Sequence, residues 1–177
     1  LAAGFDKNGK LMDFLPALGF GSLEVGTVTP LAQAGNDKPR LFRLPKDQAI
    51  VNRMGFNNEG MAVMKDRLND RHAHIPVGVN IGKNKTTPNE EAMRDYEKCF
   101  EALAKSADFM VVNVSSPNTP NLRELQEKDV LWNLLGRLTE MNRAMEKPLP
   151  LLLKIAPDLT DEALEDIVEI ARAVHID

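Results

Sequence analysis

The stretch FMVVNVSSPNT, residues 109–119, joins a short apolar run to a cluster of turn-forming residues. Residues 109–114 are uncharged and rich in β-branched side chains, the pattern of a buried strand. The strand ends abruptly, because Pro117 biases Ser116 toward an extended conformation. Loops at the carboxyl ends of buried strands are where α/β proteins place their chemistry, so this loop is a candidate functional segment. The same residue types also occur in ordinary turns, and local composition does not separate the two interpretations.

The composition is that of an ordinary globular chain. Its 177 residues are 43% hydrophobic and 27% charged, which suits one domain with a core. A formal net charge of −4 without a basic run argues against nucleic-acid binding. Cys99 is the single cysteine, which excludes an internal disulfide and indicates a reducing compartment. The histidines lack ligand spacing, so no metal site is expected, and no apolar run reaches the roughly 18 residues of a membrane span.

Apolar patterning predicts both strands and helices. We predict strands over residues 1–5, 23–28, 77–81, 109–114 and 151–155. We predict helices over residues 8–19, 93–103, 131–141 and 164–174. The first helical pattern is the weakest because Pro16 interrupts it. Asp129 and Thr160 are expected to cap the last two helices, and Cys99 falls on a helical stripe that indicates core packing.

Residues 40–52, between the second and third predicted strands, have the pattern of a β-hairpin. Two short apolar arms flank the turn-forming segment LPKDQ at 44–48. The turn-rich residues 53–58 follow directly and are a candidate binding loop.

Alternating strands and helices imply parallel βαβ units, in either an open doubly wound sheet or a (β/α)8 barrel. The absence of G-x-G-x-x-G after a strand disfavours a nicotinamide dinucleotide fold. Five strands cannot close an eight-stranded barrel, so a barrel would be represented by its first half and a little more. Polar residues at or near the strand ends are expected to converge on one rim: Lys7, Thr27, Asn80, Asn113, Ser116 and Lys154.

Seven short motifs occur in order along nearly the whole chain, at residues 2–9, 24–30, 39–44, 52–57, 78–85, 113–119 and 154–159. In this order they resemble the class 2, quinone-dependent dihydroorotate dehydrogenases of pyrimidine biosynthesis. The resemblance implies a (β/α)8 TIM barrel, of which this chain supplies about the first five βα units plus the hairpin insertion. It further implies that residues 1–177 are a single FMN-binding barrel domain truncated at both ends.

The resemblance also implies an activity. The family oxidises dihydroorotate to orotate with FMN, and the class 2 enzymes pass the electrons to a quinone. A loop serine removes the C5 proton while the C6 hydride passes to flavin N5, and Ser116 matches that base. Class 1 enzymes carry cysteine at this place, so Ser116 also indicates class 2. A serine hydroxyl is a poor base at neutral pH, and nothing in the sequence identifies how Ser116 would be deprotonated.

Matching positions imply a substrate site made of Lys7, Asn52, Arg53, Met54, Gly55, Phe56, Asn113 and Asn118. Side-chain amides suit a ring with alternating N–H and C=O groups, because each offers a donor and an acceptor. Outside its motif, Lys7 would be read as an ordinary surface lysine.

Matching positions also imply an FMN site made of Ala2, Ala3, Gly4, Phe5, Asp6, Thr27, Asn80, Asn113 and Lys154. The small residues would let the backbone approach the flavin face. Thr27 and Asn80 match positions that hydrogen-bond the isoalloxazine ring, although Asn80 also suits a turn cap. Lys154 would stabilise the anionic reduced flavin, and an interior lysine in an apolar strand needs some such partner.

The chain departs from the family pattern at Asn121, where the family has glycine. Asparagine tolerates the left-handed region, so we expect the loop to keep its shape. The family's later Thr-Asn-Thr segment, its phosphate-binding turns and its amino-terminal helical extension have no counterpart in these residues. The resemblance therefore implies a chain that is inactive alone, taken from a peripheral protein of the bacterial or mitochondrial inner membrane.

Three alternatives stand beside this interpretation. The first is a class 1-like dihydroorotate or dihydropyrimidine dehydrogenase, which Ser116 disfavours. The second is a Schiff-base barrel lyase using Lys154, which borohydride trapping of a carbonyl substrate would reveal. The third is an inert barrel piece that acts only as a folding or assembly partner.

Overall fold

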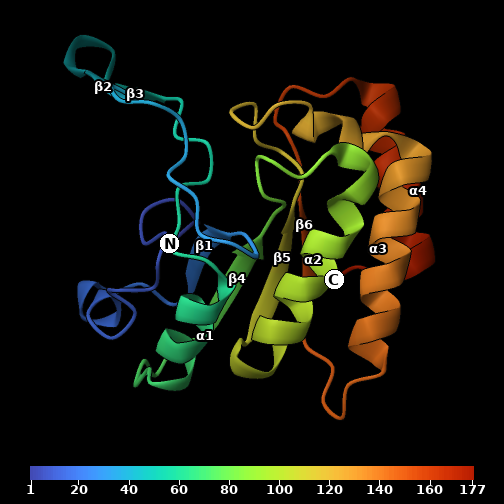
Figure 1. Cartoon of the computed structure of the whole chain (residues 1–177), viewed down its shortest axis with the longest axis horizontal. Coiled ribbons are helices and arrows are strands. Elements are labelled where there is room, and N and C mark those ends of the chain that lie inside the picture. The colour runs from blue at the N-terminus through green and yellow to red at the C-terminus, as the bar shows by residue number, and fades with distance from the viewer.

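A single parallel sheet organises the computed structural model, which describes all residues from 1 to 177 (Figure 1). Its strands, in spatial order, are β1 (Leu23–Val28), β4 (Val77–Ile81), β5 (Phe109–Asn113) and β6 (Leu151–Lys154). Every neighbouring pair is parallel, and the spatial order follows the chain without reversal. A doubly wound sheet reverses its order at a switch point, so this fold is a partial (β/α) barrel.

Helices connect the strands. α1 spans Met61–Asn69, α2 spans Ala92–Leu103, α3 spans Lys128–Arg143 and α4 spans Asp161–Val174. The last three lie together on one side of the sheet (Figure 1). The predicted helices at 93–103, 131–141 and 164–174 are therefore confirmed with slightly wider bounds, whereas α1 was not predicted. Its apolar stripe is short, with only Met64 and Leu68 buried, and gives a weak periodic signal.

The core lies between the strands and the apolar stripes of these helices. All five residues of β4 are buried, as expected for a strand covered on both faces. Cys99 is completely buried on α2, which confirms its packing role. Buried helical side chains complete the core, among them Tyr96, Phe100, Leu103, Leu131, Leu135 and Leu138.

The predicted hairpin is confirmed. β2 (Leu41–Leu44) and β3 (Ala49–Asn52) pair antiparallel across a short 3₁₀ turn, Pro45–Asp47. Every residue of both strands is exposed, and the hairpin projects away from the sheet (Figure 1). Its apolar side chains therefore remain more than a third exposed.

Two predicted elements at the amino end are wrong. Residues 1–5 form turns instead of a strand, although they run beside β1: Gly4 N donates to Gly26 O at 3.0 Å. Gly4 has φ +108°, which is incompatible with a regular extended strand. Residues 8–19 contain only the 3₁₀ turn Leu15–Leu18, because Pro16 cannot serve as a donor in a continuous helix.

Of the two predicted helix caps, one is confirmed and one is wrong. Thr160 does cap α4, with its Oγ1 accepting from Ala163 N at 3.3 Å. Asp129 does not cap α3, because the helix begins one residue earlier and Glu127 is its N-cap. Asp129 instead lies in the first turn, where its negative charge still interacts favourably with the positive end of the helix dipole.

Core packing makes a direct stability prediction. Leu135→Ala should lower the free energy of unfolding by about 2–5 kcal/mol, because Leu135 on α3 is fully buried and its truncation leaves a cavity. Leu164→Ala is the matched control on α4, where the leucine is 36% exposed, and should cost less than about 1 kcal/mol. Urea denaturation followed by circular dichroism measures both. Equal losses would contradict the location of the core.

Candidate functional site

Three polar side chains meet at the carboxyl ends of three adjacent strands. Thr27 lies on β1, Asn80 on β4 and Asn113 on β5, and each is at most 4% exposed. The Thr27 hydroxyl donates to Asn80 Oδ1 at 2.5 Å. Asn113 Nδ2 donates to Thr27 Oγ1 at 2.9 Å and to Asn80 Oδ1 at 3.0 Å. The parallel register places the three strand ends level, so the predicted convergence of these residues is what the structure shows.

Further contacts orient the two amides of this cluster. Asn80 Nδ2 donates to Glu24 Oε1 at 2.7 Å, while Asn113 Oδ1 accepts from the backbone and hydroxyl of Ser115. Tyr96, fully buried on α2, donates its hydroxyl to Asn113 O at 2.8 Å. Asn80 is thus a strand residue in a polar network and does not cap a turn. A cluster with this many partners is held rigid before any ligand arrives.

Positive charge collects beside the amide cluster. Lys154 ends β6 and pairs in register with Asn113, and its side chain is half-buried. Burial lowers the pKa of Lys7, and the positive charges of Arg40 and Lys154 lower it further. Lys7 and Lys154 are therefore close enough to repel each other. This corner of the rim is therefore electropositive.

The loop that carries Ser116 rests on the end of the hairpin. Ser116 Oγ accepts from Asn118 N at 3.2 Å. Asn118 Nδ2 in turn lies 3.4 Å from Asn52 O and 3.3 Å from Asn52 Oδ1, at the end of β3. Ser116, Asn118 and Asn52 thus come together although 66 positions separate Asn52 from Asn118.

The loop of residues 52–56 is shaped from its inner side. Gly55 and Phe56 both have positive φ, of 71° and 55°, and both are buried. Gln33 Nε2 donates to Gly55 O at 3.2 Å and to Phe56 O at 3.1 Å. Met54 O accepts from Asn36 N at 3.0 Å. These bonds fix a backbone conformation that a non-glycine residue such as Phe56 rarely adopts.

Two predicted site residues use their side chains away from the cluster. The Arg53 guanidinium donates to Pro39 O through Nε at 3.0 Å and Nη2 at 2.9 Å. The Asp6 carboxylate accepts from Lys10 N and Leu11 N, each at 2.8 Å, and so closes a local turn. The backbone of both residues is bonded within the chain as well: Arg53 N donates to Arg40 O at 2.8 Å, and Gly26 N donates to Asp6 O at 3.4 Å.

The small residues at the amino end leave open space. A Cβ added to Gly4 would meet no atom within 4 Å, and Ala2 and Gly4 are both exposed. Phe5 is 67% exposed and covers neither of them from within the chain. The segment is therefore a surface that a flat ligand could approach closely.

Sequence reasoning missed the polar network behind these loops. Asn84, 4% exposed, places Nδ2 within 3.0 Å of Thr29 Oγ1, Leu31 O and Gln33 Oε1. Its backbone N–H donates to the buried Asp95 carboxylate of α2 at 2.9 Å. Asn84 belongs to the motif at residues 78–85, but nothing in the local sequence indicates which distant groups its side chain bonds. Asn121 does behave as predicted, with φ 55° in the left-handed region.

Fold and site together define an α/β-barrel protein whose strand ends carry an amide cluster beside a group of positive charges. A family model described as "Dihydroorotate dehydrogenase" matches residues 1–177. The chain belongs to the dihydroorotate dehydrogenase family.

Named relatives agree with this assignment. The chain is 59% identical over 176 residues to "Dihydroorotate dehydrogenase (quinone)" of Christiangramia forsetii, covering 99% of this chain and 52% of that protein. It is 51% identical over 177 residues to the protein of the same name in Natronomonas pharaonis. This match covers 100% of this chain and 49% of that protein. The chain thus spans about half the length of these relatives. None of its helices is both long and apolar enough to cross a membrane.

A solved structure also matches. The crystal structure of DHODH in complex with ferulenol from Eimeria tenella superposes with a TM-score of 0.92 at 41% identity. The match covers 100% of this chain and 54% of that one. The interpretation as part of an α/β barrel is therefore confirmed, with four parallel strands where five were predicted, and the resemblance found in the sequence is correct.

The crowding of positive charge predicts a pH effect. The pKa of Lys7 is lower in the folded chain than in the unfolded chain, so holding Lys7 protonated destabilises the fold. That cost is fully present below the folded pKa and disappears as pH rises through the unfolded value of about 10.4. Lys7→Met should therefore raise the free energy of unfolding at pH 7, and its advantage over wild type should shrink toward pH 10.

Denaturant unfolding at both pH values measures this effect. Lys65→Met, which removes an exposed lysine from α1, controls for the loss of one positive charge. A destabilising effect of Lys7→Met at pH 7 would show that Lys7 is held by a favourable partner instead.

Proposed function

We propose that the protein carrying this chain oxidises dihydroorotate to orotate with FMN and passes the electrons to a quinone, in de novo pyrimidine biosynthesis. The observation that carries the proposal is the meeting of Thr27, Asn80 and Asn113 beside two mutually repelling lysines, under the Ser116 loop. The names of the relatives support dihydroorotate as the substrate and a quinone as the electron acceptor.

The residues present fit the isoalloxazine part of FMN. The open surface at Ala2, Ala3 and Gly4, flanked by Phe5 and Asp6, has room for a flat ring. Thr27, Asn80 and Asn113 would bind the polar edge of that ring by exchanging bonds now made among themselves. Lys154 would place a positive charge where the reduced flavin carries negative charge.

The substrate would lie between the cofactor surface and the two loops. Lys7 would pair with the carboxylate of dihydroorotate, which would also restore the ordinary pKa of its ammonium group. Asn52, Asn113 and Asn118 would read the alternating N–H and C=O groups of the ring. Because the Arg53 side chain is turned away and the carbonyl oxygens of residues 53–56 accept bonds from Asn36 and Gln33, this segment would contribute the walls of the site.

The chemistry assigned to this chain is proton removal. Ser116, after passing its own hydroxyl proton to solvent, would accept the proton from C5 of dihydroorotate, and the electron pair of the C5–H bond would form the C5–C6 double bond of orotate as hydride leaves C6. FMN, when bound, supplies the acceptor for that hydride. The bond from Asn118 N to Ser116 Oγ supports this role, because it holds the hydroxyl oxygen at a defined position in the loop.

The quinone as acceptor places the proposed enzyme at a membrane. We propose peripheral attachment to the bacterial or mitochondrial inner membrane, with the names of the quinone-class relatives as support. Family membership gives no support to the lyase interpretation of Lys154. The class 1 alternative lacks support for a different reason, which is that these similar relatives carry the quinone name.

Anaerobic flavin bleaching tests the proposal. In the Christiangramia forsetii relative, the segment that aligns with residues 1–177 is replaced by these residues to give a full-length chimaera. Dihydroorotate should bleach the flavin of this chimaera rapidly. Ser116→Ala should slow the bleaching by about 10²-fold or more, the usual contribution of a general base. Ser22→Ala, which removes an exposed hydroxyl just before β1, is the matched control for the loss of one hydroxyl.

Each outcome has a definite meaning. A flavin-loaded chimaera that is not bleached by dihydroorotate contradicts the proposed function. Equally fast bleaching with Ser116→Ala keeps the substrate and cofactor but removes Ser116 from the role of base.

A further inference from the structure

Asn36 lies between the two loops that carry the proposed substrate and base residues. Its Nδ2 donates to Arg53 O and to Asn118 O, each at 3.0 Å. Its Oδ1 accepts from Lys85 Nζ at 3.1 Å. Two carbonyl oxygens on one side and an ammonium on the other admit only one orientation of the amide. Neither the sequence motifs nor the family comparison assigns Asn36 a role.

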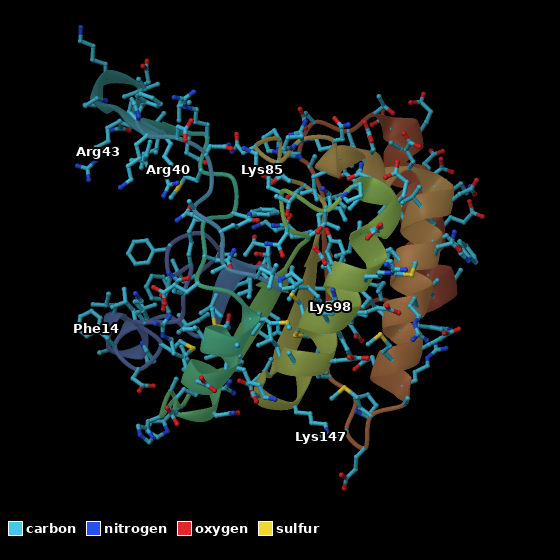
Figure 2. All side chains as sticks on the ribbon, viewed as in Figure 1. Phe14, Arg40, Arg43, Lys85, Lys98 and Lys147 are labelled. Atoms are coloured by element: carbon cyan, nitrogen blue, oxygen red, sulfur yellow. The ribbon has the colours of Figure 1, made fainter.

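The backbone around Asn36 is held as firmly as its side chain. Asn36 N donates to Met54 O at 3.0 Å, and Arg40 Nη1 donates to Asn36 O at 2.8 Å. Gly55 packs directly on the amide, since a Cβ there would come within 2.8 Å of Asn36 Cγ. Figure 2 shows Arg40 and Lys85 at the same end of the molecule, near the base of the hairpin. Four separate segments therefore converge on this one residue.

The pattern of partners differs from that of an ordinary turn asparagine. Asparagine in a turn bonds its own backbone about two residues away. The side-chain partners of Asn36 are 17, 82 and 49 positions away along the chain. This amide therefore joins distant loops and does not stabilise its own turn.

We propose that Asn36, oriented by Lys85, is a positioning residue that latches the loop of residues 115–119 to the loop of residues 52–56. Asn36 touches no proposed reacting atom. It acts through Asn118, whose carbonyl it holds and whose backbone N–H anchors Ser116 Oγ. The catalytic consequence rests on the proposed function, whereas the latch itself does not.

Hydrogen exchange of the 177-residue chain tests the latch without reference to any activity. Asn36→Asp keeps the shape of the side chain but turns a carboxylate oxygen toward two carbonyl oxygens. The amides of residues 52–56 and 115–119 should then exchange about tenfold faster or more, because two hydrogen bonds are lost. The amides of β4 should be unchanged. Asn133→Asp, at an exposed position of α3, is the matched control.

Lys85→Met removes only the group that orients the amide. It should accelerate exchange in the same two loops, by less than Asn36→Asp does. Uniform acceleration across the chain would mean that Asn36 serves general stability, and no acceleration in the loops would mean that it bridges nothing. Either result overturns the proposal.

Flavin reduction in the chimaera tests the consequence for catalysis. Dihydroorotate deuterated at C5 is compared with dihydroorotate deuterated at C6. Displacing Ser116 slows only the removal of the C5 proton, so Asn36→Asp should slow bleaching about tenfold or more at saturating substrate. It should also raise the deuterium effect from C5 relative to that from C6, whereas Asn133→Asp should change neither quantity.

The outcomes separate the two proposals. A slower rate with an unchanged C5 deuterium effect would overturn the positioning role. If the unmodified chimaera is not bleached, the proposed function fails, and hydrogen exchange alone decides whether the latch exists.

Discussion

The Asn113 amide is the constraint on which the rest of the site depends. It is buried at the end of β5, where an unpaired amide would destabilise the fold by about 1–3 kcal/mol. Its nitrogen is satisfied by Thr27 and Asn80 and its oxygen by Ser115. One side chain therefore ties β1, β4 and the loop after β5 together. Neither the strand ends nor the loop can shift without leaving a buried polar group unpaired.

This arrangement explains how a rim so rich in polar groups stands on an apolar core. Below the rim, the strands and helices pack mainly through aliphatic and aromatic side chains, and a buried polar group such as Asn142 is hydrogen-bonded to the backbone of Leu149. At the rim, amides and hydroxyls bond one another in a buried environment, where such bonds are strong and directional. Lys7 is the exception, because the charges that shift its pKa are those of Arg40 and Lys154, and both are positive. A site that is unfavourable without an anion is suited to bind one.

The loops are controlled by residues that stand behind them. Gln33 shapes the backbone at Gly55 and Phe56, and Asn84 holds Gln33 from the end of β4. Asn36 reaches both loops from the same connecting segment. The long connection between β1 and β4 thus does more than carry the exposed hairpin. It supplies the side chains that set the distance between the two loops facing the candidate site.

The sequence by itself determined the parallel α/β class, the hairpin, three of the four helices, the buried Cys99 and the family. These properties follow from periodicity, turn residues and motif order, which are local along the chain. It misplaced the first strand and helix, where Gly4 and Pro16 override the apolar pattern, and it overlooked the short helix α1. Only the tertiary structure decided that Arg53 turns away, that Lys7 and Lys154 repel each other, and that Asn36 bridges two loops. Hydrogen bonds and charges act between groups brought close by folding, and residues 82 positions apart leave no periodic trace of such a contact.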